Sequence, residues 1–278
     1  LMNKNNIFIC LGGGKKQFPL IEASLDLGFD ILLVDRDPHP LCQDRCFKII
    51  KCSTHDSEKV IFELKKFFVN SKPKAVIYYT SGQPIITAAC ICEAFKLPGI
   101  SLDLAKASVE KTFLYNFCKK LNIPIPYSKR VKSWAEIKNN FYGMVIKPDL
   151  PIRGTRNVFR LLNLKQSKID FEKSKEESLN DFVKVQEYVF GLDIIVIAIV
   201  QKKKIASILF LDQWVVLLES KFKKIGLSIP STKYDKVVVD KIEKVIDNFI
   251  ESCKFNYGFI SFSFRVDLNK DIWLYEVN

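Results

Sequence analysis

Residues 185–193 have the sequence Val-Gln-Glu-Tyr-Val-Phe-Gly-Leu-Asp, and residues 145–148, upstream of them, read Val-Ile-Lys-Pro. An apolar run at 144–147 predicts one strand, and a second strand is expected at 183–188. Lys147 ends the first run directly before a proline, and Asp193 lies six residues beyond Glu187. Lys147 and Asp193 are therefore among the first candidate site residues.

Two more features extend this prediction toward the N-terminus. Lys111 falls in the first turn of a helix that we expect from Ser108 to about Leu121. Gly154 lies in the loop 149–157, between one strand and the next. Two lysines and a loop of backbone N–H donors are groups that clamp a polyphosphate.

The segments at residues 187–193 and 276–278 supply other kinds of groups. A strand at Glu187, Tyr188 and Val189 offers backbone groups to the edge of an adenine, and the carboxylate of Asp193 is suited to ribose hydroxyls. Glu276 and Asn278 are two residues apart on the last strand, so they point to one face and offer oxygen ligands suited to magnesium.

The order of these features resembles the ATP-grasp superfamily over essentially the whole chain. The closing segment Leu-Tyr-Glu-Val-Asn at 274–278 completes the series. Residues 11–42, which include Val-Asp-Arg-Asp-Pro and Pro-Leu-Cys, are similar to the first domain of carbamoyl phosphate synthase-like and carboxylate-amine ligase members. The resemblance implies an ATP-dependent ligase that joins a small-molecule carboxylate to an amine through an acyl phosphate.

The expected fold combines α/β and α+β parts in three domains. An open parallel α/β domain covers residues 1–106, and a linking helix with a small α+β lid covers 107–186. A C-terminal grasp domain with an antiparallel sheet covers 187–278, and in family members the chain continues further. In the first domain, apolar runs at 7–11, 31–34 and 75–79 alternate with helical segments. A helix is expected at 134–140, and the charged segment 163–181 is expected to be an exposed helix or loop.

The resemblance also implies roles for individual residues. Lys111 and Lys147 would contact the ATP phosphates, and Gly154 would belong to the lid loop that covers them. Glu187, Tyr188 and Val189 would form the adenine hinge, and Asp193 would hold the ribose. Mg²⁺ would be bound by Glu276 and Asn278. Arg265 is the candidate catalytic residue, as a stabiliser of the γ-phosphate or acyl phosphate, and the alternative for it is a surface pairing residue.

Two positions depart from the family pattern. The penultimate strand usually carries an acidic metal ligand about a dozen residues before the glutamate, but here the face offers only Ser261 and Ser263. A non-catalytic nucleotide-binding protein with a degenerate metal site is therefore the first alternative. Asn157 stands where the lid loop more often has glycine, and asparagine tolerates a positive φ.

The N-terminal unit supports a second alternative, an NAD-dependent oxidoreductase. Gly12, Gly13 and Gly14 follow a strand and precede a helix, and Asp35 ends the next strand, as in a dinucleotide-binding fingerprint. The third glycine of that fingerprint is replaced by Gln17. The match is partial, so a structural or substrate-facing turn is the favoured interpretation.

Composition limits the remaining classes. The chain of 278 residues carries a formal charge of +12, but its lysines are scattered without interleaved aromatic residues, so we expect no nucleic-acid partner. No apolar run approaches the roughly 18 residues of a membrane span, and the first residues lack a signal-peptide core. We expect a cytoplasmic protein with small-molecule partners, and a homodimer is compatible with it.

Its eight cysteines favour reduced, buried thiols over disulfides. A zinc site is the alternative at a set of four potential ligands, Cys42, Cys46, Cys52 and His55.

Overall fold

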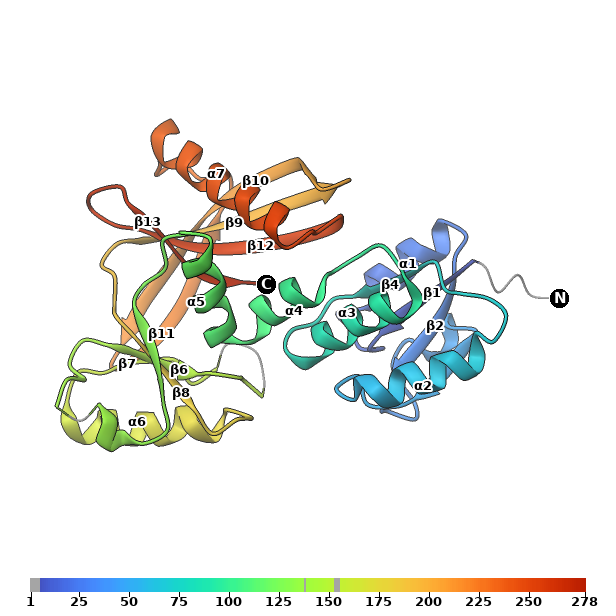
Figure 1. The fold of residues 1–278 in the computed structure, drawn as a ribbon, viewed down its shortest axis with the longest axis horizontal. Coiled ribbons are helices and arrows are strands. Elements are labelled where there is room, and N and C mark those ends of the chain that lie inside the picture. The colour runs from blue at the N-terminus through green and yellow to red at the C-terminus, as the bar shows by residue number, and fades with distance from the viewer. Residues whose placement is uncertain (1–5, 138, 153–155) are drawn as a thin grey trace. The chain divides into compact units, whose positions relative to one another are not determined.

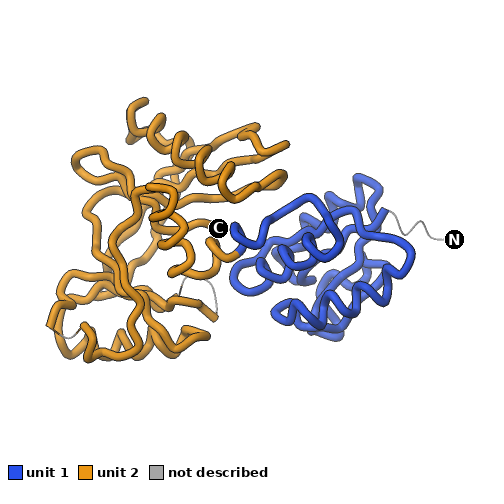
Figure 2. Tube along the Cα trace, in the orientation of Figure 1, with its two compact units in different colours: residues 1–105 blue, residues 106–278 orange. Residues whose placement is uncertain are grey.

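The computed structural model describes residues 6–137, 139–152 and 156–278. The chain forms two compact units, residues 1–105 and 106–278, which Figure 2 shows in different colours. The α/β and α+β architecture predicted from the sequence is confirmed: the first unit has a parallel sheet and the second an antiparallel one (Figure 1).

The first unit is built on a four-stranded parallel sheet with the order β3-β2-β1-β4. Its strands are β1 (Ile7–Leu11), β2 (Asp30–Asp35), β3 (Lys48–Lys51) and β4 (Ala75–Tyr78). Its helices are α1 (Phe18–Asp26), α2 (Ser57–Phe67), α3 (Gln83–Phe95) and the short 3₁₀ helix η1 (Gln43–Arg45), and α4 (Leu102–Val109) leads into the second unit. Residues 31–34 are fully buried because helices cover a parallel sheet on both faces.

Packing explains one glycine of the loop after β1. A Cβ atom on Gly13 would lie 2.8 Å from the side chains of both Leu33 and Pro40, so this position has no room for a side chain. The backbone N–H of Gly13 also donates to the carboxylate of Asp35 at 2.7 Å. Gly13 is therefore required by the close approach of this loop to the end of β2.

The second unit contains a nine-stranded sheet whose order is β13-β12-β9-β10-β11-β7-β6-β8-β5. The strands are β5 (Ser128–Val131), β6 (Val145–Pro148), β7 (Phe159–Arg160), β8 (Val183–Gln186), β9 (Leu192–Gln201), β10 (Lys204–Leu218), β11 (Lys221–Ser228), β12 (Tyr257–Val266) and β13 (Ile272–Val277). The helices are α5 (Lys111–Lys120), η2 (Trp134–Glu136), α6 (Leu164–Glu176) and α7 (Lys236–Ser252). A single residue pair, Lys221 with Phe159, joins β11 to β7 and so connects the two halves of the sheet.

Each half of this sheet has its own core. Helix α7 buries Val238, Ile242, Ile246 and Phe249, whose spacing of three or four residues places them on one face, and Phe249 meets Phe262 of β12 edge to face at 5.3 Å. In the other half, Phe171 of α6 packs with Phe159 and the buried residues of β6 and β8. Two cores on either side of a narrow strand connection leave space for a cavity between them.

Several predicted elements differ from the structure. The helix expected from Ser108 is divided at Glu110 between α4 and α5, and the helix expected at 134–140 is only the 3₁₀ turn η2. The charged segment 163–181 forms α6, whose inner face buries Asp170 and Phe171 despite its many charges. Strands β3 and β11 were not predicted, because their apolar residues are few and lysines interrupt them. In the described part of the chain, every helix is too short or too polar to cross a bilayer.

The packing around Gly13 generates a test. The Gly13→Ala variant should lower the free energy of unfolding by about 1–3 kcal/mol, because the new methyl group overlaps Leu33 and Pro40. Denaturant unfolding of the full chain measures this. Gly14→Ala is the matched control, since its nearest contact would be an ordinary 3.4 Å to Gln17, and equal losses in the two variants would contradict the assignment.

Candidate nucleotide-binding site

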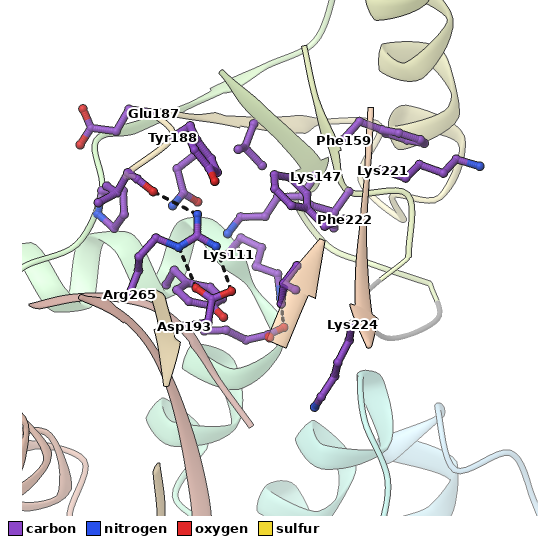
Figure 3. A pocket seen from close by; sticks show the side chains of 18 of the residues that line it. Lys111, Lys147, Phe159, Glu187, Tyr188, Asp193, Lys221, Phe222, Lys224 and Arg265 are labelled. Atoms are coloured by element: carbon purple, nitrogen blue, oxygen red, sulfur yellow. Dashed lines mark hydrogen bonds and ion pairs between the residues drawn. The ribbon is translucent and has the colours of Figure 1, made fainter. Parts of the chain in front are cut away.

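The second unit contains a cavity of about 680 Å³ between the two halves of the nine-stranded sheet. Eight of the residues predicted as functional line it: Lys111, Lys147, Glu187, Tyr188, Val189, Asp193, Arg265 and Glu276. They come from α5, β6, β9, β12, β13 and the segment after β8, and Figure 3 shows how Lys111, Lys147, Glu187, Tyr188, Asp193 and Arg265 lie. Residues far apart in the sequence therefore converge on a single cavity.

The two predicted phosphate-binding lysines are both buried in its wall. Lys111 is the first residue of α5 and is 9% exposed, and Lys147 in β6 is 8% exposed. Burial first, and then the nearby charge of Lys111, lower the pKa of Lys147 to about 7 against the opposing effect of Glu276. An anion in this cavity would stabilise the charged form of Lys147.

A network around Asp149 holds Lys111 in place. The carbonyl of Asp149 accepts from the backbone N–H of Lys111 at 3.1 Å, and its carboxylate accepts from Thr112 at 2.5 Å and from Asn180 at 2.9 Å. On the other side, Nζ of Lys184 donates to the carbonyl of Lys111 at 3.0 Å. These bonds anchor the start of α5 to β8 and to the end of β6, so one network positions Lys111 and Lys184.

Lys184 was not singled out from the sequence. It is 3% exposed in β8, and burial lowers its pKa to about 8, with opposing contributions from Asp149 and Lys111. The sequence did not indicate this burial, because Lys184 stands between two valines in β8. In a strand with one exposed face, such alternation of apolar and charged residues would place the lysine in solvent. Both faces of β8 are covered, so the lysine is buried with its neighbours.

Asp193 and Arg265 form an ion pair across neighbouring strands. They are direct partners in the β9–β12 register, and the guanidinium donates to both oxygens of Asp193 at 2.7 and 2.9 Å. Arg265 also donates to the carbonyl of Val189 at 3.1 Å. The alternative interpretation of Arg265 as a surface pairing residue is thus half right: it does pair, but in the wall of the cavity. Roles in binding ribose and phosphate stay predictions for these two residues.

The hinge segment presents an aromatic surface to the cavity. The ring of Tyr188 is nearly parallel to that of Phe222 at a centroid distance of 6.0 Å, and the guanidinium of Arg160 lies 4.0 Å from it. Glu187 instead fixes the chain: its carboxylate accepts from the N–H of Tyr127 at 2.6 Å and points away from the lysines in Figure 3. Phe222 was missed because β11 was not predicted, and Arg160 was not singled out because it lies in β7, away from the motifs that the sequence offered.

A bulge in the last strand aims two side chains at the cavity. Ser263 pairs with Glu276, but the next residue, Phe264, pairs with Leu274, so Tyr275 is an extra residue in β13. Strict alternation would direct Tyr275 and Glu276 to opposite faces, whereas both line the cavity. Glu276 lies 3.6 Å from Nζ of Lys111.

The predicted magnesium ligands separate in the structure. Glu276 lines the cavity, whereas Asn278 lies outside the lining and exchanges backbone hydrogen bonds with Ser261 at 2.8 and 2.9 Å. Within the described residues, no three histidine, cysteine or acidic side chains gather into a metal site. The chain thus brings one carboxylate to the place predicted for the metal, and Mg²⁺ binding stays a prediction.

Gly154 lies outside the described residues. After it, Arg156 and Asn157 line the cavity, and Asn157 has a φ of 52°, in the left-handed region that asparagine tolerates.

The N-terminal alternatives gain no support from the geometry. Both oxygens of Asp35 accept backbone N–H groups, from Gly13 at 2.7 Å and Asp37 at 2.9 Å, so the carboxylate stabilises its own loop. The cysteines are all free, and neither Cys42 nor His55 belongs to a metal-ligand cluster of described residues. Burial raises the pKa of Cys46 to about 12, which keeps it a thiol.

Comparison with known proteins identifies the fold. No protein-family model matches the sequence, and no curated protein matches it. Solved structures match over essentially the whole chain. L-amino acid ligase from Bacillus licheniformis is 15% identical with a TM-score of 0.77, over 100% of this chain and 67% of its own. Phosphoribosylglycinamide synthetase from Anaerococcus prevotii is 18% identical with a TM-score of 0.71, over 99% and 68%.

A third match is N5-carboxyaminoimidazole synthetase from Staphylococcus aureus, solved as a complex with ADP. It is 14% identical with a TM-score of 0.74, over 100% of this chain and 72% of its own. The chain thus spans about two thirds of the length of these proteins. It has the ATP-grasp fold that the sequence predicted.

The pKa of Lys184 generates a prediction. Its folded-state pKa of about 8 is below the ordinary value of 10.5, so the unfolded chain binds the extra proton between these values and the native state gains stability as the pH rises through them. Lys184→Met lacks this gain, so wild type should become more stable relative to the variant from about pH 8 to 10.5. Urea unfolding across this range measures the difference. Exposed Lys204, replaced in the same way, should show no such trend, and a parallel pair of curves for Lys184→Met would refute the burial effect.

Proposed function

We propose that the protein is an ATP-dependent ligase that activates a small-molecule carboxylate as an acyl phosphate, which an amine then attacks. The observation that carries the proposal is the convergence of two buried lysines, an arginine, a carboxylate and the hinge segment on one cavity. The shared fold with two synthetases and a ligase supports the same class of reaction.

The nucleotide would lie between the two halves of the nine-stranded sheet. Its base would meet the backbone of 187–189 and the ring of Tyr188, since aromatic faces stack on bases. Its phosphates would face Lys111 and Lys147, whose buried ammonium groups would form charge-assisted hydrogen bonds to the phosphate oxygens. ADP bound to the similar synthetase supports this placement.

The reaction depends on position and charge. An oxygen of the substrate carboxylate attacks the γ-phosphorus of ATP, and the bond to the bridging oxygen of ADP breaks. The amine then attacks the acyl carbon, inorganic phosphate leaves, and the amine loses a proton. Lys111, Lys147 and Arg265 would stabilise the negative charge on the transferred phosphoryl group, as fixed cations do in phosphoryl transfer. A Mg²⁺ ion held by Glu276 would add to this charge stabilisation when bound.

A nucleotide-binding protein without ligase activity is the second candidate. Ser263 favours it, because this residue pairs directly with Glu276 at a position where a second carboxylate would complete a metal site.

ADP release over a panel of carboxylates and amines tests the ligase proposal. A ligase releases ADP only when a carboxylate substrate is present, and with the amine it forms one molecule of ligated product for each ADP released. ATP binding with no ADP release across a broad panel would favour the second candidate.

Nucleotide binding itself is tested at Lys147. Lys147→Ala should weaken ADP binding by about tenfold to a hundredfold, because it removes a charge-assisted hydrogen bond to phosphate. Calorimetric titration and the rise in melting temperature with ADP both report it. Lys204→Ala is the control at an exposed lysine of the same unit and should bind ADP as the wild type does. An undiminished affinity in Lys147→Ala would contradict the site.

A further inference from the structure

The cavity carries an excess of positive charge. Six basic and three acidic side chains line it. The basic residues are Lys111, Lys147, Arg156, Lys221, Lys224 and Arg265. An adenine nucleotide brings a polyanion into this space, and the attraction between opposite charges strengthens when burial removes water. The wall therefore contains enough cationic groups to balance the phosphates by itself.

The three carboxylates are already engaged by the protein. Glu187 accepts from the N–H of Tyr127 at 2.6 Å. Asp193 is held by two hydrogen bonds from Arg265 and is only 5% exposed. Glu276 lies 3.6 Å from Lys111, and the exposed fractions of these two side chains are 16% and 9%. A divalent cation at Glu276 would have to displace Lys111 from this largely buried ion pair or share the carboxylate with it.

The neighbouring position adds no second anionic ligand. Ser263 is the direct cross-strand partner of Glu276 and is 5% exposed. Its hydroxyl is neutral, and divalent magnesium is usually held by carboxylates and phosphates. One carboxylate that is shared with a lysine is a weak metal site. Lys111 and Lys147 lie in the same wall and can bind the phosphates directly.

We propose that this cavity neutralises the nucleotide phosphates with its own lysines and arginines, and that ADP consequently binds with similar affinity with and without a divalent cation. We assign this independence from a divalent cation to Ser263, because a neutral residue opposite Glu276 supplies no second carboxylate and Glu276 stays paired with Lys111. The inference rests on the proposed function only in that the cavity binds an adenine nucleotide.

Calorimetric titration of the full chain with ADP, in millimolar Mg²⁺ and separately in EDTA, tests this. The two dissociation constants should agree within about tenfold. A loss of more than about tenfold in EDTA would overturn the inference and leave the proposed function intact. Absence of ADP binding in both conditions would reject the nucleotide site, and the inference would fall with it.

Two variants at residue 263 sharpen the test. Ser263→Asp places a carboxylate across from Glu276, so Mg²⁺ should now raise the ADP affinity more than about tenfold over that in EDTA. Ser263→Asn is the matched control, of similar size and without charge, and should behave like the wild type. Circular dichroism verifies that each variant folds. If Ser263→Asp does not fold, the wild-type comparison decides by itself; a folded Ser263→Asp protein indifferent to Mg²⁺ would overturn the role assigned to Ser263.

Discussion

Burial of ammonium groups beside one another is the constraint on which the site depends. Lys111, Lys147 and Lys184 are each less than 10% exposed, and Lys111 lowers the pKa of both other lysines. Removing a charge from water is costly unless a partner compensates. Such an arrangement stabilises whatever polyanion enters the cavity, at some expense to the stability of the empty protein. Strain of this electrostatic kind is common where proteins bind charged ligands.

The surrounding fold keeps these cations from moving apart. Asp149 connects the start of α5 with the end of β6, and Asn180 and Thr112 hold its carboxylate. Since the bonds run to the backbone as well as to side chains, the ammonium group of Lys111 is placed by a helix terminus rather than by a flexible loop. A rigid support of this kind limits how far the buried cations can relax away from one another.

The opposite wall depends on strand register. Arg265 and Asp193 are partners in the β9–β12 ladder, and the same guanidinium reaches the carbonyl of Val189 and the ring of Tyr188. The hinge, the carboxylate and the aromatic surface are therefore linked through one side chain. In β13 the extra residue Tyr275 changes the alternation, so that Glu276 and Tyr275 both border the cavity. Register and bulge together decide which groups line the cavity.

Local sequence was enough to predict the α/β unit, the strands around Lys147 and Glu276, and eight of the residues that line the cavity. Short-range patterns report these features because apolar periodicity and chain-breaking residues act over a few positions. Only the tertiary structure revealed four other features. These are the burial of Lys184, the pairing of Asp193 with Arg265, the bulge at Tyr275 and the aromatic contact of Phe222 with Tyr188. Each depends on which strands become neighbours and in which register. Those choices are made by packing between segments far apart in the chain, which a local pattern does not record.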